Sequence, residues 1–127
     1  MKVFRFLAHE AFDKQYLDFI VAHEDLSDSL KTQLQKSCTN PDAGRCLHEI
    51  PHPSLQGKLF RLHVGGPKGY RYIYLFDAKH EVVIPIYISQ QPRKAFDWDI
   101  HRFLKDALQI AEDLEAGNMK RFKERIL

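Results

Sequence analysis

The sequence predicts an α+β fold in which an N-terminal strand and two helices precede an antiparallel meander of three strands. Three observations support this expectation. Apolar residues recur at helical spacing twice within the first 40 positions and once more after position 98. Between these segments, residues 58–89 contain three β-rich runs separated by short turn sequences. The chain has 127 residues and 44% hydrophobic content, which is enough for one globular domain with a real core.

The N-terminal segment is expected to form a short strand at Val3–Leu7 and a helix at about Ala11–His23. The residues that form one apolar stripe on this helix are Phe12, Tyr16, Phe19, Ile20 and His23. The stripe has the spacing of a helix that packs one face on a core.

A second helix should begin with a side-chain cap from Asp25 or Ser27. Asn40-Pro41-Asp42 should end it, because proline disfavours the helical conformation of the residue before it. Residues 42–56 contain prolines at 51 and 53 and are expected to be a loop. The predicted buried positions of this helix are Leu30, Leu34 and Cys38.

The meander is predicted at Lys58–Val64, Tyr70–Phe76 and Val82–Ser89. Alternation in the first of these strands places Phe60, Leu62 and Val64 on one face and Leu59, Arg61 and His63 on the other. Pro85 cannot donate a hydrogen bond, so it should lie on an edge strand or at a bulge. We expect helices to cover one face of this small mixed sheet and aromatic side chains to cover the other.

The region after this core (residues 1–98) is predicted to be a long helix at about Asp99–Ala116, followed by a basic tail at Lys120–Arg125. Gly117-Asn118 supplies the stop signal. The helix and tail (residues 99–127) are expected to belong to the same domain as the core. The residues on its apolar face are Ile100, Phe103, Leu104, Ala107, Ala111 and Leu114.

Charge is unevenly distributed, although the formal net charge is only +2. No acidic residue occurs between Ile50 and Phe76. The basic residues and histidines of that stretch are His52, Lys58, Arg61, His63, Lys68 and Arg71. Such a hairpin could bind anions, or its charges could protect a sheet edge from aggregation.

Four basic side chains are candidates for a common site. Arg61 and His63 share one face of a strand, Arg71 lies on the neighbouring strand, and Arg93 follows the third strand. Guanidinium groups bind phosphate oxygens and remain charged at neutral pH. Histidine can exchange a proton there. This set suits metal-independent RNA cleavage, in which a base deprotonates the 2′-hydroxyl and cations stabilise the phosphorane.

Aromatic residues could stack on unpaired bases. An aromatic stripe with period two, such as Tyr70, Tyr72 and Tyr74, is more typical of a core. Phe96 and Trp98 remain candidates for base stacking because they lie near Arg93 in the sequence.

The two cysteines, Cys38 and Cys46, are expected to be reduced thiols, one on a helix and one in a loop, of a cytoplasmic protein. A zinc site formed with His48 and His52 is an alternative, but its spacing fits no common pattern. No segment reaches the length of a membrane-spanning apolar helix. We expect no metal and no cofactor.

Several segments, taken in order, resemble the RelE/ParE toxin superfamily. Residues 55–65 are similar to its L-x-G-x-x-x-R-x-R-V-G strand, and residues 69–74 to its G-Y-R-x-x-Y strand. Residues 91–96 resemble the basic segment after the last strand, and Asn40-Pro41 is typical after the second helix. The resemblance covers residues 3 to about 98. It implies a RelE-like fold and a toxin of a type II toxin–antitoxin system, with an antitoxin as partner.

In the RelE branch, the resemblance implies an mRNA endonuclease that acts on the ribosome. Arg61 and His63 would be the base and a phosphate ligand, Arg71 would stabilise the transition state, and Arg93 would serve as acid or phosphate ligand. RelE has lysines at the positions of the first two, and arginine cannot act as a base, so His63 would carry that role. Residues that would contact RNA are Lys58, Lys68, Lys94, Phe96 and Trp98.

The sequence leaves two alternatives open. The ParE branch, with a similar fold, poisons DNA gyrase and needs no nuclease chemistry. A non-catalytic protein of this fold could bind only RNA or a protein partner. The C-terminal helix could pack on the sheet, form a homodimer interface or occupy the groove of an antitoxin.

Overall fold

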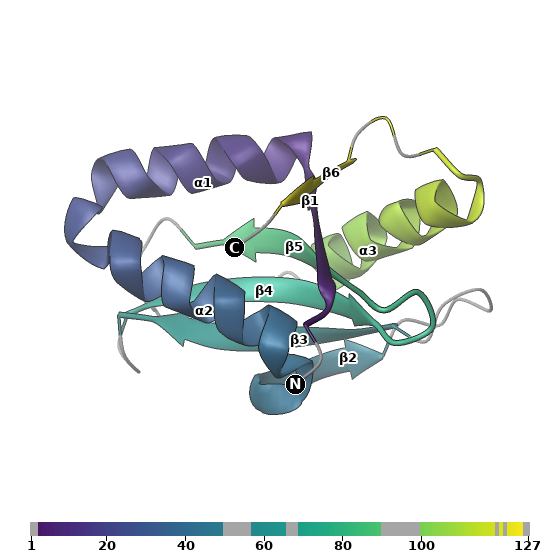
Figure 1. The fold of residues 1–127 in the computed structure, drawn as a ribbon, viewed down its shortest axis with the longest axis horizontal. Coiled ribbons are helices and arrows are strands. Elements are labelled where there is room, and N and C mark those ends of the chain that lie inside the picture. The colour runs from purple at the N-terminus through teal and green to yellow at the C-terminus, as the bar shows by residue number, and fades with distance from the viewer. Residues whose placement is uncertain are drawn as a thin grey trace.

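The computed structural model describes residues 3–49, 57–65, 69–89, 100–118, 120 and 122–125. Its elements follow one another as shown in Figure 1. They are β1 (Arg5–His9), α1 (Glu10–Ala22), η1 (Glu24–Leu26), α2 (Ser27–Thr39), η2 (Pro41–Ala43), β2 (Arg45–Glu49), β3 (Gly57–Val64), β4 (Tyr70–Asp77), β5 (Val82–Ile88), α3 (Ile100–Glu115) and β6 (Phe122–Arg125).

The strands form one mixed sheet of six, in the order β2-β3-β4-β5-β1-β6. Strands β2 to β5 pair antiparallel with their neighbours, and β1 joins β5 in parallel. The last strand, β6, pairs antiparallel with β1. The α+β prediction is confirmed in its main points: an N-terminal strand, two helices and a strand meander follow in that order.

Two strands were not expected from the sequence. The predicted loop over residues 42–56 contains β2, which pairs with the first half of β3. The predicted basic tail contains β6, which is held by β1 and by Phe122, a core residue that is 8% exposed. Both segments lack the period-two alternation that identifies a strand, so their own sequences do not predict one.

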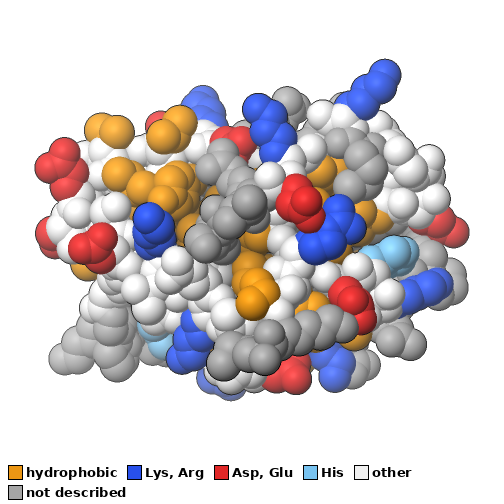
Figure 2. All heavy atoms as spheres, in the orientation of Figure 1, with side chains coloured by type: hydrophobic (Ala, Val, Ile, Leu, Met, Phe, Trp, Pro, Cys, Tyr) orange, Lys and Arg blue, Asp and Glu red, His pale blue; other side chains and the backbone are white. Residues whose placement is uncertain are grey.

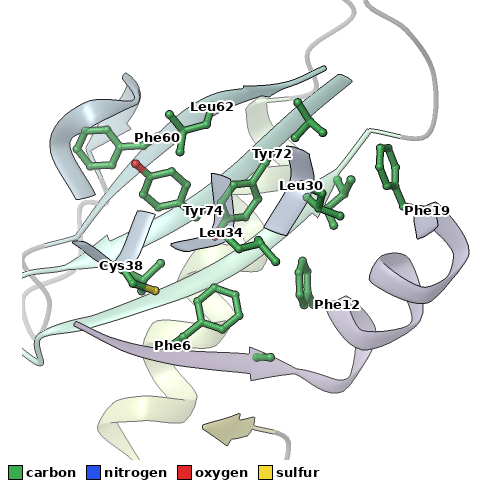
Figure 3. Close-up of a cluster of buried hydrophobic side chains, with 14 residues drawn as sticks. Phe6, Phe12, Phe19, Leu30, Leu34, Cys38, Phe60, Leu62, Tyr72 and Tyr74 are labelled. Atoms are coloured by element: carbon green, nitrogen blue, oxygen red, sulfur yellow. The ribbon is translucent and has the colours of Figure 1, made fainter. Parts of the chain in front are cut away.

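The core on one face of the sheet lies beneath α1 and α2 (Figure 1). Figure 3 shows the rings of Tyr72 and Tyr74 pointing from the sheet toward residues of both helices. The two phenol rings stack on each other, and Phe60 stacks on Tyr74. The expected buried positions of α2, namely Leu30, Leu34 and Cys38, all lie in this core.

The opposite face is covered by α3 rather than by the aromatic side chains expected there. Ala107 and Ile110 of α3 pack with Leu59, Leu75 and Ile84 of the meander. Of the roles left open for the C-terminal helix, packing on the sheet is the one observed. With 16 residues, α3 is about 24 Å long, an ordinary length rather than the long helix expected.

The start of α2 differs from the prediction. Its N-cap residue is Leu26, and neither Asp25 nor Ser27 provides a side-chain cap. The 3₁₀ turn η1 leads directly into the helix, and its backbone hydrogen bonds take the place of a cap. The end of α2 is as predicted, with Asn40 as the C-cap and Pro41 starting η2.

Pro85 lies where the pairing of β4 with β5 shifts register, between Ile73 and Tyr74 on the partner strand. Of the two expected locations, the bulge is correct and the edge is not, because β5 lies between β4 and β1. A bulge tolerates the proline since the local ladder is already interrupted there.

The surface in Figure 2 shows apolar side chains gathered over α1, at the upper left of the view. Leu17 and Val21 contribute to the exposed apolar surface of this helix, at 62% and 79% exposure. They are one helical turn apart and therefore share a face. In the part of the chain described here, no helix is long and apolar enough to cross a membrane.

Candidate anion-binding site

The β3–β4 ladder brings three of the predicted site residues together. His63 is the direct cross-strand partner of Arg71, and Arg61 lies two residues before His63 on the same face. Side chains directly opposite each other in a ladder have Cβ atoms about 5 Å apart. The arrangement therefore concentrates two guanidinium groups and one imidazole within a small area of the sheet.

The two arginines are almost completely buried, with Arg61 7% and Arg71 8% exposed, whereas His63 is half-buried. Charges in such a poorly solvated position act more strongly on an approaching anion than charges in water. On the same face, Ala107 and Ile110 of α3 share a hydrophobic cluster with Leu59, Leu75 and Ile73, the cross-strand partner of Arg61. His63 is four residues from Leu59, or about 13 Å along the strand.

A fourth basic residue belongs to this cluster and was missed from the sequence. Arg45 opens β2 and is the cross-strand partner of Arg61. It is exposed and lies on the same face as Arg61. No sequence pattern pairs these two residues, because residues 42–56 are predicted to be a loop.

A groove of about 280 Å³ runs along the edge of β3, where β2 begins. It joins the cluster to the last turns of α2. The residues that line it are Gln33, Lys36, Ala43, Gly44, Arg45, Arg61, Leu62 and His63. Every charged side chain in this lining is basic or a histidine, so the groove favours an anion.

Tyr74 holds the wall of this groove in place from inside the core. Its hydroxyl donates to the carbonyl oxygen of Pro41 in η2, at 2.5 Å, and accepts a hydrogen bond from the backbone N–H of Gly44. Burial raises the pKa of the phenol well above its usual value, so Tyr74 stays neutral. A Cβ at Gly44 would lie 2.7 Å from the carbonyl oxygen of Arg61, so only glycine permits this close approach.

Gln33 adds a polar group to the α2 side of the groove. Its side-chain oxygen, Oε1, is buried, and the described residues provide no hydrogen-bond partner for it. A buried acceptor without a donor is energetically costly, so binding of a group that donates a hydrogen bond to this atom would be favourable.

The remaining predicted site residues do not join the cluster in the described part of the chain. Lys58 is exposed and alternates onto the opposite face of β3 from Arg61 and His63. Predicted residues that lie outside the described residues are Lys68, Arg93, Lys94, Phe96 and Trp98.

The tyrosine stripe on β4 belongs to the core, as its period of two indicated. Tyr72 and Tyr74 are fully buried, and Tyr70 is half-buried against Phe19 and His23. The hydroxyl of Tyr72 lies 3.1 Å from that of Ser37 on α2. These rings are therefore not a platform for bases.

The two cysteines are free and lie in different environments. Cys38 is buried in α2, and burial raises the pKa of its thiol from 9.0 to about 11. Cys46 is exposed on β2 rather than in the loop expected. Within the described ranges, no group of three or more His, Cys, Asp or Glu side chains is placed to hold a metal ion.

The chain was compared with protein-family models, curated proteins and solved structures, and none of them matches.

Proposed function

We propose that this chain is a RelE-like toxin that cleaves messenger RNA, without a metal ion, on the ribosome. The pairing of His63 with Arg71, with Arg61 on the same face, is the observation that carries the proposal. The order of a strand, two helices and a meander agrees with the resemblance in sequence. That resemblance supplies the toxin–antitoxin context and the ribosomal substrate, whereas the cytoplasmic location is proposed from the two free thiols.

In the proposed reaction, the imidazole of His63 accepts the proton of a ribose 2′-hydroxyl. The 2′-oxygen then bonds to the adjacent phosphorus, and the bond from phosphorus to the 5′-oxygen breaks. The leaving 5′-oxygen takes up a proton, so one proton has moved in total from the 2′ to the 5′ side. The products are a 2′,3′-cyclic phosphate and a 5′-hydroxyl end.

The arginines supply the electrostatic part of the mechanism. The phosphorane carries more negative charge than the phosphodiester, so nearby cations stabilise it more than they stabilise the substrate. Arg61 and Arg71 are buried, and the ladder fixes the backbone that carries them, so little reorganisation is needed when the charge develops. Arg93 is proposed to bind the phosphate or protonate the leaving group, on the resemblance alone.

A protein partner is part of the proposal, because a toxin of this type is held inactive by its antitoxin. The exposed pair Leu17 and Val21 on α1 gives such a partner an apolar surface to contact. Copurification of a small acidic protein encoded beside this gene would support the assignment.

The test is an RNA-cleavage assay in a translating extract, with wild type, His63→Ala and Arg71→Ala. Wild type should produce messenger RNA fragments with 2′,3′-cyclic phosphate ends, and both variants should lose at least 100-fold in rate. Lys31→Ala, an exposed basic residue of α2, is the control and should cleave normally. Circular dichroism checks that every variant is folded.

Full cleavage by both folded variants would overturn the nuclease assignment. Growth arrest with intact messenger RNA and inhibited DNA supercoiling would support the gyrase-directed alternative instead. Binding to RNA without cleavage or arrest would leave a non-catalytic protein of this fold.

A further inference from the structure

We propose that the groove at the edge of β3 binds one ribonucleotide that flanks the cleaved bond, and that Gln33 recognises its 2′-hydroxyl. This proposal rests on the proposed function, because it extends the same site beyond the reacting phosphate. The groove shares Arg61 and His63 with the catalytic cluster and leads from them to α2. A strand of RNA held at the cluster can therefore continue directly into the groove.

The phosphate of this nucleotide is held by Lys36 and Arg45. Both side chains are exposed, both line the groove, and they approach it from different elements, α2 and β2. They are not needed at the reacting phosphorus, where the buried Arg61 and Arg71 already supply positive charge. Exposed cations of this kind contribute to affinity for the RNA backbone and make it dependent on salt.

The sugar is recognised through Gln33. Its buried Oε1 needs a donor, and no donor of the described residues is hydrogen-bonded to it. A phosphate oxygen only accepts hydrogen bonds, so it cannot satisfy this atom. A ribose 2′-hydroxyl can donate, and it is the group that distinguishes RNA from DNA. Gln33 is therefore a specificity residue and takes no part in the chemistry.

The size and the anchoring of the groove agree with one bound nucleotide. Its volume of about 280 Å³ lies at the lower limit of the range for small-molecule sites. This volume is too small for an oligonucleotide. The bonds from Tyr74 to Pro41 and from Gly44 to Tyr74 fix the wall that carries Arg45. The site is consequently formed before the ligand arrives.

The experiment measures binding of short RNA oligonucleotides that carry a 2′-deoxy group at the cleaved position, which prevents cleavage. A second deoxy substitution is then placed at the nucleotide on either side, and at a distant position as a control. Affinity is followed by fluorescence anisotropy over a range of salt concentrations. The proteins are wild type, Gln33→Met, Lys36→Ala, Arg45→Ala and the control Lys31→Ala.

For wild type, a deoxy group at one flanking position should weaken binding about three- to tenfold, and the distant one should not. Gln33→Met should bind the parent oligonucleotide more weakly than wild type by the same factor. For this variant, the flanking deoxy substitution should cause no further loss of affinity. Lys36→Ala and Arg45→Ala should each reduce the slope of log affinity against log salt by about 0.7. Lys31→Ala should match wild type.

Additive losses from Gln33→Met and the flanking deoxy group would overturn the role of Gln33. Salt slopes of Lys36→Ala and Arg45→Ala equal to that of Lys31→Ala would overturn the phosphate site. These results would leave the nuclease assignment intact if His63→Ala still abolishes cleavage. Conversely, the groove variants could change RNA affinity as predicted while the wild-type protein cleaves no RNA. That result would reject only the nuclease assignment.

Discussion

His63 lies directly opposite Arg71 in the β3–β4 ladder, on a face of the sheet that also carries Arg61 and Arg45. Neither member of the pair contributes to the two hydrophobic cores. The pair combines a half-buried histidine with a buried arginine, which is the arrangement that the proposed reaction uses.

The first prediction concerns the pH dependence of cleavage. Because a base must be neutral to accept the 2′-proton, the cleavage rate should fall as the pH is lowered below neutrality. His63→Gln keeps a polar side chain without a titrating ring. Its remaining slow cleavage rate should no longer fall on the acidic limb of the pH–rate profile. Single-turnover rates between pH 5 and 8 measure both profiles. An unchanged acidic limb in the variant would assign the base to another residue.

A second prediction concerns the wall of the groove. Tyr74→Phe removes the hydroxyl that joins Pro41 to Gly44 and leaves a carbonyl oxygen without this donor. The free energy of unfolding should decrease by about 1–2 kcal/mol, as for other buried hydrogen bonds. Affinity for RNA should fall as well, because Arg45 follows this segment directly. Urea denaturation of wild type and Tyr74→Phe measures the difference in the free energy of unfolding. Tyr16→Phe, at a half-buried position on α1, is the control.

Much of the fold could be predicted because its elements have regular apolar patterns. The stripe of α1 and the alternation of β3 placed Phe12, Phe19, Phe60 and Leu62 in the core, and all four are there. Turn residues fixed the limits of the meander to within a residue or two. The same alternation placed Arg61 and His63 on one face, which the structure shows.

The remainder depended on contacts that are distant in sequence. Arg45 joins the cluster only because β2 pairs with β3, and β2 has no alternation that would identify it. In the sequence, Gln33 has the pattern of an ordinary polar residue of a helix. Its proposed role in binding depends on the groove, which residues of η2 help to line. Phe122 was assigned to a basic tail because a single apolar residue among charges is a weak signal. Sheet pairing, rather than local pattern, determined the positions of Arg45 and Phe122.

A third prediction concerns stability at alkaline pH. The Cys38 thiol has a pKa of 9.0 when unfolded and about 11 when buried, so the folded state keeps its proton longer. The contribution of this thiol to the free energy of unfolding is complete below pH 9. It is lost as the pH rises from 9 to 11, and the loss is at most about 3 kcal/mol. Tyr72 and Tyr74, whose pKa values are also raised by burial, extend the loss above pH 10.

The measurement is the free energy of unfolding at several pH values between 8 and 11. Cys38→Ala should be less stable at pH 8 because it leaves a small cavity, but its stability should decline less steeply between pH 9 and 11. Cys46→Ala, at an exposed position, should follow wild type. Parallel curves for Cys38→Ala and wild type would show that the thiol does not contribute to the decline.

The last prediction compares two residues of β6 that hold the C-terminal strand in different ways. Phe122 is 8% exposed and packs in the core beneath α3, whereas Glu124 pairs with Arg5 at the surface, where both side chains are more than half exposed. Loss of a buried aromatic ring typically costs about 3–5 kcal/mol, whereas an exposed ion pair contributes no more than about 1 kcal/mol. Phe122→Ala should therefore destabilise the protein far more than Glu124→Ala, and added salt should reduce only the smaller effect. Thermal unfolding at two salt concentrations tests this, and equal losses in the two variants would mean that β6 is not anchored by its aromatic residue.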